Sequence, residues 1–405
     1  MIGQIQVSRF MQPSPDPANF ALKANVLFGG NSVSLVPDKI FKMGFKCPGL
    51  IIDETVYRQE PIQSLLEAWQ HKGLHPSKLF LSRAGQEPDY DYLDSVAEDF
   101  RPLELDLVIG IGGGSTMDLA KGVGVLMRNA GRGITYRGMN LVPAPGVPVV
   151  LIPTVAGCGS EVSETASFID RATKTKLGIN GRYVGCLFAV LDPVLLTTCP
   201  PSVTLGSGLD AMVHAIEAVT ARTAHALSVF LGTEAVRLLF AALPIGVVQP
   251  ADLKAREQLL LASFYAGIAM CHAAGGPASG ISYPLGVHFN VPHGYAGGLL
   301  LPHVVAANLS KGYLDGYARL YQRLDGRRSD SPRTERAKAE AFRDALRELY
   351  GQLGAPSSFK PWNVDRTAID QLTELTMTQR KGNLELNPAP FGRGDVVGIL
   401  EAVLS

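Results

Sequence analysis

Three side chains in the second half of the chain are suited to metal binding or proton transfer. Asp210 and His214 are four residues apart in a stretch with helical periodicity, so both lie on one helix face, one turn apart. Glu217 lies near the same face. A carboxylate and an imidazole placed in this way can be metal ligands, an acid–base pair or a buried structural pair. His293 stands between a proline and a glycine and opens an apolar helix, which predicts a fixed position at a turn.

A glycine-rich stretch in the first half has the character of a phosphate-binding turn. An apolar run at residues 105–111 predicts a buried strand, and helical periodicity begins again at Met117. The residues between them include Gly112, Gly113, Gly114 and Ser115. A strand that turns through glycines into a helix presents free backbone N–H groups at a positive helix end, where a pyrophosphate can bind. Ser115 and Thr116 are candidate helix caps. The spacing matches neither the Rossmann nor the Walker pattern, so a plain turn is the alternative.

Two further strand ends carry polar side chains that could contact a nucleotide. Asp53 closes an apolar strand at residues 50–53, where its carboxylate could accept hydrogen bonds from ribose hydroxyls or cap the next helix. The strand at residues 148–154 runs into a loop of small residues, in which Thr154 and Ser160 can donate to phosphate or ribose. Two such loops on one sheet support each other as a binding site.

The elements that must position these side chains divide the chain into two parts. Strand-like runs alternate with helices up to about residue 193, which is typical of a parallel, doubly wound α/β sheet. Beyond residue 200 the periodicity is almost wholly helical. We therefore place a domain boundary between an α/β domain at residues 1–199 and an all-helical domain at residues 200–405. Residues 1–20 are expected to form an edge strand and an arm, and residues 326–336 a mobile surface loop.

The bulk composition excludes several classes of protein. The 405 residues carry 37 Lys and Arg against 37 Asp and Glu, so no net charge draws the chain to nucleic acid or to an anionic membrane. The five cysteines show no paired spacing, which argues against a disulfide framework and fits a reducing cytosol. We find neither a signal-peptide pattern nor about 18 consecutive apolar residues, and we expect a cytoplasmic protein that does not span a membrane.

Taken together, these motifs resemble those of the iron-containing, or group III, alcohol dehydrogenases, and the resemblance covers nearly the whole chain. The stretches that carry it are residues 112–121 with Asp118 and Lys121, residues 153–162, residues 191–193, residues 208–218, residues 284–286, residues 292–294 and residues 387–388. The resemblance implies an α/β nucleotide-binding domain, an all-helical second domain and an active site in the cleft between them.

The resemblance also implies roles for single residues. The pyrophosphate is expected at residues 112–115, and Asp53 is expected to favour NAD(H) over NADP(H). The adenine, ribose and nicotinamide path is then lined by Thr154, Cys158, Ser160, Val162 and Lys176, with threonine the usual residue at position 158. A small alcohol or carbonyl substrate and a homodimeric assembly are also expected.

The metal site departs from the family pattern. Members of the family bind a divalent metal with one Asp and three His, and Asp210, His214 and His293 match three of these ligands. Where the family usually reads His-Ala-Met-Ala-His-Pro, residues 279–284 read Ser-Gly-Ile-Ser-Tyr-Pro, so Ser279 replaces the fourth ligand and Tyr283 replaces a second active-site histidine. A hydroxyl is a poor substitute for an imidazole, so binding of Fe²⁺ or Zn²⁺ is in doubt.

We therefore expect an NAD(H)-dependent oxidoreductase that interconverts an alcohol and an aldehyde or ketone, without a tightly bound metal. Asp210, His214 and His293 would polarise the substrate oxygen, either through a metal or through a polar network, and Tyr283 is the candidate proton donor. Three alternatives stay open. They are a metal-free reductase similar to maleylacetate reductases, a lyase similar to dehydroquinate synthase, and a nucleotide-binding pseudo-dehydrogenase without turnover.

Overall fold

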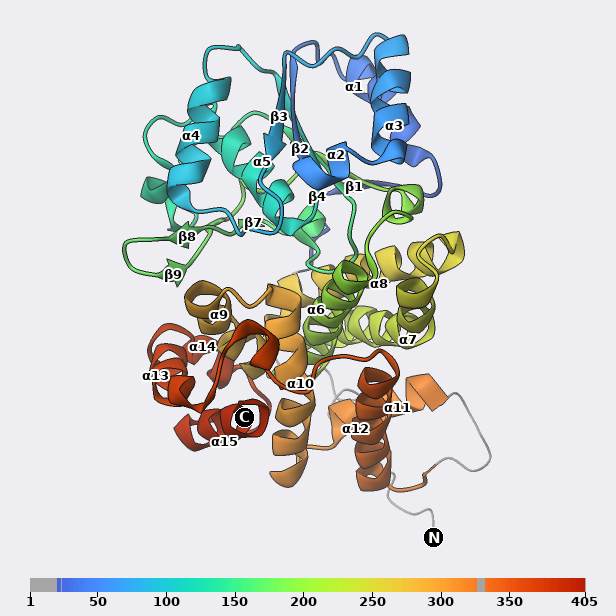
Figure 1. Cartoon of the computed structure of the whole chain (residues 1–405), viewed down its shortest axis with the longest axis vertical. Helices are drawn as coiled ribbons and strands as arrows, with labels where there is room; N and C mark the ends of the chain where they lie inside the picture. Colours follow the sequence, from blue (N-terminus) through green and yellow to red (C-terminus); the bar gives the residue numbers. More distant parts are fainter. Residues whose placement is uncertain (1–19, 23, 326–331, 405) are drawn as a thin grey trace.

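The computed structural model describes residues 20–22, 24–325 and 332–404. Its first half is built on a sheet of six parallel strands in the order β1-β11-β6-β4-β2-β3. These strands are β1 (Asn25–Phe28), β2 (Pro48–Asp53), β3 (Lys78–Ser82), β4 (Leu107–Gly112), β6 (Val149–Pro153) and β11 (Phe188–Leu191). The expected doubly wound α/β architecture is confirmed (Figure 1). The predicted N-terminal strand and arm fall almost wholly on residues 1–19, which lie outside the described residues.

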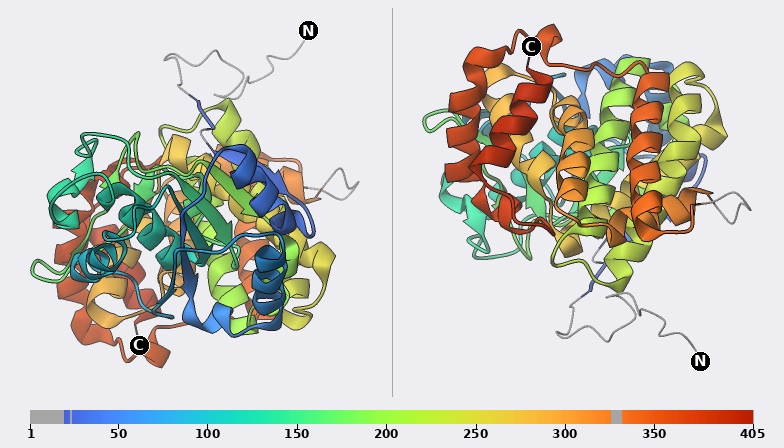
Figure 2. Two further views of the ribbon diagram at one scale, coloured as in Figure 1. Left: turned by 90° about the horizontal axis from the view of Figure 1, so that it is seen from above. Right: turned by 90° about the horizontal axis from the view of Figure 1, so that it is seen from below.

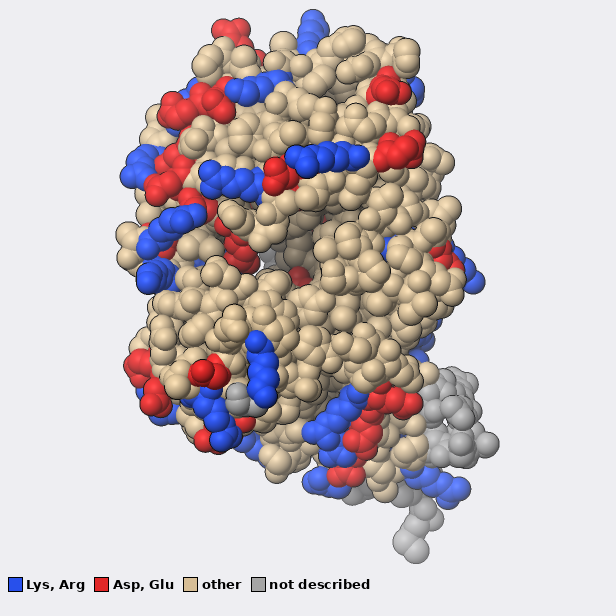
Figure 3. Space-filling view, in the orientation of Figure 1, with Lys and Arg blue, Asp and Glu red and all other residues tan. Residues whose placement is uncertain are grey.

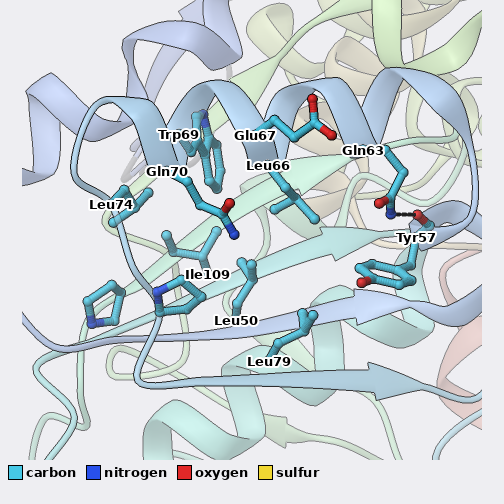
Figure 4. A pocket seen from close by; sticks show the side chains of 12 residues that line it. Leu50, Tyr57, Gln63, Leu66, Glu67, Trp69, Gln70, Leu74, Leu79 and Ile109 are labelled. Atoms are coloured by element: carbon cyan, nitrogen blue, oxygen red, sulfur yellow. Dashed lines mark hydrogen bonds between the residues drawn. The ribbon is translucent and has the colours of Figure 1, made fainter.

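Helices cover both faces of this sheet because alternate strand residues point to opposite sides. Leu50, Ile52 and Ile109 pack in one core with α1 (Val36–Lys42) and α3 (Glu60–His71), while Ile51 and Val108 pack in another with α4 (Tyr90–Phe100) and α5 (Gly114–Leu126). Between α3 and the sheet lies a small hollow of about 260 Å³, into which apolar side chains of the helix and the strands point (Figure 4). It is separate from the cleft described below.

Short strands and turns extend from the carboxyl-end side of the sheet. β8 (Ile169–Asp170) and β9 (Thr175–Lys176) pair antiparallel. β5 (Gly138–Met139), β7 (Thr165–Ala166) and β10 (Ile179–Asn180) form a second small sheet. These pieces lie at the face of the nucleotide-binding half that meets the helical half (Figure 1).

The second half of the chain is helical, as predicted. Its helices are α6 (Pro201–Thr220), α7 (Ala226–Val248), α8 (Leu253–Ala273), α9 (Pro277–Phe289), α10 (His293–Ser310), α11 (Asp315–Asp325), α12 (Glu335–Gln352), α13 (Ile369–Gln379), α14 (Lys381–Glu385) and α15 (Arg393–Val403). They stack side by side below the sheet (Figure 2). By length and composition α7 could cross a membrane, but half of its most apolar stretch is buried inside the protein, and buried core helices also have this length and composition.

Several details differ from the prediction. α5 begins at Gly114 with Gly113 as its N-cap, so Ser115 and Thr116 are inside the helix and do not cap it. α6 begins at Pro201, directly after the residue at which the helical part was predicted to start. α9 was not predicted as a helix, because Gly280 and Pro284 interrupt its pattern. The boundary proposed between residues 199 and 200 falls in the connection between β11 and α6, and it stays a proposal. The predicted surface loop falls largely on residues 326–331, outside the described residues.

Candidate functional site

A cleft of about 920 Å³ separates the sheet from the helices. Its walls come from both halves of the chain, and it opens at the waist of the molecule, where acidic side chains are visible inside it (Figure 3). Ten of the residues predicted to form the site line this cleft, namely Gly114, Ser115, Asp118, Cys158, Ser160, Lys176, Asp210, His214, Tyr283 and His293. The fold therefore brings residues that are far apart in the sequence together around one cleft.

The glycine turn leaves the helix end of α5 open to this cleft. Gly114 is the first helical residue, and a Cβ there would lie 2.7 Å from the Cys158 Sγ. Since real Cβ atoms are not found at such distances, the close packing of the turn against the second loop depends on glycine at this position. The free N–H groups of the first turn of α5 therefore face the cleft with room for a phosphate.

Asp118 forms hydrogen bonds with the loop that contains Ser160. Its Oδ1 accepts a hydrogen bond from the Ser160 Oγ at 2.6 Å, and its Oδ2 accepts one from the Ser167 backbone N–H at 2.9 Å. Lys121 is buried beside it and donates to the Thr165 carbonyl at 2.7 Å. Together these bonds fix the loop that lines the cleft, so Asp118 is placed to position Ser160 as well as to line the cleft itself.

Asp53 caps a short helix. Its Oδ1 accepts hydrogen bonds from the backbone N–H groups of Thr55 and Val56 at 2.9 and 3.2 Å, and from the Thr55 hydroxyl. The structure thus shows the cap interpretation directly. Because all three bonds use Oδ1, ribose binding through Oδ2 stays a prediction. Asp53 is not among the residues that line the cleft.

The remaining predicted cofactor residues lie around the same strand ends without lining the cleft. Gly112 ends β4, and Gly113 caps α5. The Thr154 hydroxyl is buried and has no hydrogen-bond partner among the described residues. Val162 packs beside Gly267 of α8 and so contacts the helical half of the protein. A bound ligand could supply a partner for the Thr154 hydroxyl.

The three predicted metal ligands come together. The Nε2 atoms of His214 and His293 lie 3.5 and 3.8 Å from the Asp210 Oδ1, and one donor atom from each residue lies within 4.8 Å of the others. Ligands bound at about 2.1 Å to one tetrahedral cation are roughly 3.4 Å apart, so this donor set fits one divalent metal. The His214 Nδ1 is buried without a partner in the described structure, so this ring lacks the second hydrogen bond that usually orients a metal-binding histidine.

The electrostatic environment of His293 favours its neutral form. Burial disfavours the imidazolium, and the Lys176 ammonium disfavours it further, so the pKa of His293 is lowered below 6.5 although Asp210 and Glu87 oppose this effect. A neutral imidazole has a lone pair that can bind a metal or accept a proton.

The hydroxyl of Ser279 forms a hydrogen bond with the buried side chain of Glu217. The Ser279 Oγ donates to the Glu217 Oε2 at 2.5 Å, and Glu217 also accepts from the backbone N–H groups of Gly276 and Ala278 at 2.7 Å each. Glu217 therefore holds the N-terminus of α9, the helix that carries Tyr283. The hydroxyl of Ser279 is committed to this carboxylate, which agrees with its poor suitability as a fourth ligand.

An ion pair that the sequence did not reveal lies in the cleft. The Lys176 Nζ lies 2.5 Å from the Oε1 of Glu87, which belongs to the connection between β3 and α4. Burial by itself disfavours both charges, but their mutual attraction outweighs it, so the pKa of Glu87 is lowered and the pKa of Lys176 is raised. Both groups are thus charged at neutral pH. The signal available beforehand was an acidic residue just after the strand at residues 78–82.

Tyr283 lies between cationic groups and the predicted metal ligands. The Arg380 guanidinium stacks 3.7 Å from the centre of its ring, and the Lys176 Nζ lies 5.5 Å from the same point. On another side the rings of Tyr283 and His293 are 5.3 Å apart. Arg380 also donates to the Lys176 carbonyl, which links the helical half to β9. Sequence reasoning missed Arg380, because it stands in no motif.

Comparisons with known proteins agree with this geometry. The model of the iron-containing alcohol dehydrogenases matches residues 23–193, and the C-terminal model of the Fe-containing alcohol dehydrogenase family matches residues 204–404. The NAD-dependent methanol dehydrogenase of Bacillus methanolicus is 29% identical over 360 residues, which are 88% of this chain and 92% of that protein. The long-chain-alcohol dehydrogenase 1 of Geobacillus thermodenitrificans is 30% identical over 324 residues, 79% of this chain and 80% of that protein.

Solved structures show the same likeness. An alcohol dehydrogenase from Oenococcus oeni is 25% identical and superposes with a TM-score of 0.87 over 95% of this chain and all of that chain. A 1,3-propanediol oxidoreductase gives the same TM-score and identity, with 95% of this chain and 99% of that chain covered. Because the two family models together match most of its length, the chain belongs to the iron-containing alcohol dehydrogenase family, a family of alcohol–aldehyde oxidoreductases.

Proposed function

We propose that this protein transfers a hydride between NAD(H) and an alcohol that it interconverts with an aldehyde or ketone. The observation that carries the proposal is the single cleft in which the glycine turn at Gly114 and the cluster of Asp210, His214 and His293 face each other. A dinucleotide on the turn would place its reactive ring toward the cluster. A relative named as an NAD-dependent methanol dehydrogenase supports the same interpretation.

The nucleotide-binding half holds and orients the cofactor in this proposal. When bound, the nicotinamide supplies or accepts the hydride. The N-terminus of α5 at Gly114 and Ser115 binds the pyrophosphate. The hydrogen bond from the Ser160 Oγ to Asp118 keeps Ser160 in place beside it. The Oδ2 of Asp53 accepts from a ribose hydroxyl and repels a 2′-phosphate, so NAD(H) is preferred over NADP(H).

The helical half polarises the substrate oxygen. Asp210, His214 and His293 would hold Fe²⁺ or Zn²⁺, which would supply Lewis-acid polarisation of the alcohol or carbonyl oxygen. With three protein ligands and no imidazole at position 279, the metal is held less tightly than in a complete four-ligand site. Tyr283 lies against His293 and donates the proton to the substrate oxygen during reduction.

A metal-independent form of the same reaction is the second candidate. It is favoured by the hydrogen bond that commits Ser279 to Glu217 and by the two cations that flank the Tyr283 ring. In this form the histidines and Asp210 act as a polar network around the substrate oxygen, and Tyr283 remains the proton donor.

Calorimetry and steady-state kinetics test the proposal. Protein purified without chelator is expected to bind NADH more tightly than NADPH and to reduce NAD⁺ with members of an alcohol panel. Metal analysis and turnover after treatment with EDTA then separate the two forms, since turnover that resists EDTA eliminates the metal-dependent one. Absence of binding to either dinucleotide would refute the assignment altogether, and binding without turnover would identify a pseudo-dehydrogenase.

We propose in addition that the protein is a soluble, cytoplasmic homodimer. Exposed apolar side chains gather in the segment that begins at the sheet edge β1, namely Phe28, Leu35, Phe41 and Met43. An apolar edge of this kind is a candidate subunit contact. Light scattering of the purified protein at several concentrations tests this assignment, and a mass equal to one chain at all of them would contradict it.

A further inference from the structure

The phenol of Tyr283 is held through its ring and not through its hydroxyl. The guanidinium carbon of Arg380 lies 3.7 Å from the ring centre, the Lys176 Nζ lies 5.5 Å from it, and the His293 ring is 5.3 Å away. Tyr283 lines the cleft, and no hydrogen bond between described residues uses its hydroxyl. The hydroxyl is therefore open to a ligand, and the orientation of the phenol depends on the groups that pack on its ring.

Among these groups, Arg380 is a partly buried cation without a carboxylate partner in the described part of the chain. Burial lowers the pKa of Arg380, an effect that Tyr283 opposes only in part. Its Nε is buried and has no hydrogen-bond partner among the described residues. Because burying an unpaired charge costs free energy, a cation kept in such a place is a candidate for a functional role. The group that its flat face contacts is the ring of Tyr283.

A glycine in α9 permits this contact. Gly280 precedes Tyr283 by three residues, so both lie on the same side of the helix. Arg380 lies between α13 and α14, and a Cβ at Gly280 would lie 2.9 Å from the Asn383 Cβ and 3.7 Å from the Arg380 Cβ. The first distance is shorter than real Cβ contacts, so a larger residue at position 280 would push α14 away from α9. Gly280 thereby lets the guanidinium reach the ring.

Arg380 also joins the two halves of the protein. It donates a hydrogen bond to the Lys176 carbonyl of β9, and β9 lies directly above α9 and contacts it (Figure 1). One guanidinium thus contacts the candidate proton donor of the helical half and a strand of the nucleotide-binding half. The placement of Tyr283 therefore depends on the two walls of the cleft being together.

From these contacts we infer that Arg380 is a positioning residue for proton transfer, which holds the phenol of Tyr283 at the substrate oxygen when the two walls of the cleft meet. During reduction the phenolic proton moves to the carbonyl oxygen while the carbonyl carbon receives the hydride, and the phenolate regains a proton from water. Misplacement of a catalytic group by about 1 Å slows such a step by roughly a hundredfold. This inference rests on the proposed function, because it requires Tyr283 to be the proton donor.

The test follows the reduction by NADH of the aldehyde that the wild-type protein reduces fastest in a panel from acetaldehyde to hexanal. Arg380→Met keeps an extended side chain but removes the charge, the flat surface and the hydrogen bond. We expect it to lower kcat roughly tenfold to a hundredfold, with KM and the NADH Kd changed less than about threefold. The solvent deuterium isotope effect on kcat should rise, because proton transfer then limits the rate more. Arg380→Lys keeps the charge without the stacking surface and should recover only part of kcat. Arg336→Met removes an exposed guanidinium paired with Glu340 and is the control that keeps wild-type kcat.

A double-mutant cycle tests whether Arg380 acts through Tyr283. Tyr283→Phe keeps the ring and removes the proton, so adding Arg380→Met to it should change kcat less than about twofold. An equal fall of kcat in both backgrounds would overturn the inference. Gly280→Ala displaces the guanidinium without removing it and is expected to lower kcat as well, whereas wild-type kcat in this variant would also overturn the inference. Circular dichroism of each variant excludes loss of folding as the cause of a change.

The remaining results separate this inference from the proposed function. A raised NADH Kd with unchanged kcat in Arg380→Met would overturn the inference and assign Arg380 to the support of β9. Wild-type turnover in Tyr283→Phe would remove both residues from proton transfer but leave hydride transfer intact. If the wild-type protein neither binds NADH nor reduces any aldehyde of the panel, the proposed function fails together with the inference.

Discussion

Replacement of Ser279 by alanine separates a structural role of this residue from a role as metal ligand. The Ser279 Oγ donates to the Glu217 Oε2 at 2.5 Å, and both residues are only 3% exposed. Burial raises the pKa of Glu217, whereas the backbone N–H groups of Gly276 and Ala278, which donate to its two carboxyl oxygens, favour the carboxylate form. Loss of one hydrogen bond to a charged group costs about 1.5–3 kcal/mol, and alanine adds no atom to the site. We therefore expect Ser279→Ala to lower the free energy of unfolding by that amount.

Urea denaturation with unchanged slope measures this loss. Ser282→Ala is the matched control, because the Ser282 Oγ is buried in the same helix and donates to the neutral Ser279 carbonyl at 2.7 Å. Its removal is expected to cost about 0.5–1.5 kcal/mol. The divalent metal content of Ser279→Ala should equal that of the wild-type protein. Loss of bound metal with a stability change below about 0.5 kcal/mol would show that Ser279 is a ligand, and our reasoning would be wrong.

Three further perturbations test other parts of the site. Gly114→Ala places a Cβ 2.7 Å from the Cys158 Sγ, so the turn must shift, and the NADH Kd measured by calorimetry is expected to rise roughly tenfold or more. A double variant that also carries Cys158→Ala should recover part of the affinity. An unchanged Kd would contradict the role of the turn. Asp210→Asn removes one of three metal donors, so affinity for Zn²⁺ in a direct titration is expected to fall at least roughly tenfold, and an unchanged affinity would place the metal elsewhere. Burial and Lys176 lower the pKa of His293 in the folded protein. As pH falls below about 6.5, His293 is therefore protonated in the unfolded chain before it is protonated in the folded protein, and the folded protein loses stability between pH 6.5 and the lowered pKa. Between about pH 6.5 and 5, the melting temperature of His293→Asn should therefore fall less than that of the wild-type protein. An identical fall in both proteins would contradict the lowered pKa of His293.

Much of the fold and part of the site followed from local sequence pattern. The apolar strand before Gly112 and the helical spacing of Asp210 and His214 depend on neighbouring residues, because period and turn preference are local properties of the backbone. The resemblance to the family added the order of the motifs, and both family models confirmed membership of that family. Ser115 and Thr116 were predicted as helix caps but lie inside α5. Sequence pattern locates a helix end only to within one or two residues, so it cannot identify the cap residue.

Contacts between distant segments were decided only by the tertiary structure. Ser279 meets Glu217 across 62 positions of the chain, and Glu87 meets Lys176 across 89. Arg380 reaches β9 from the other half of the molecule and thereby fixes Tyr283. No periodicity encodes such pairs, because they depend on how the sheet and the helices pack on each other. The sequence by itself determined which chemical groups the protein carries and on which elements, whereas packing determined which of those groups are partners and which remain available to a substrate.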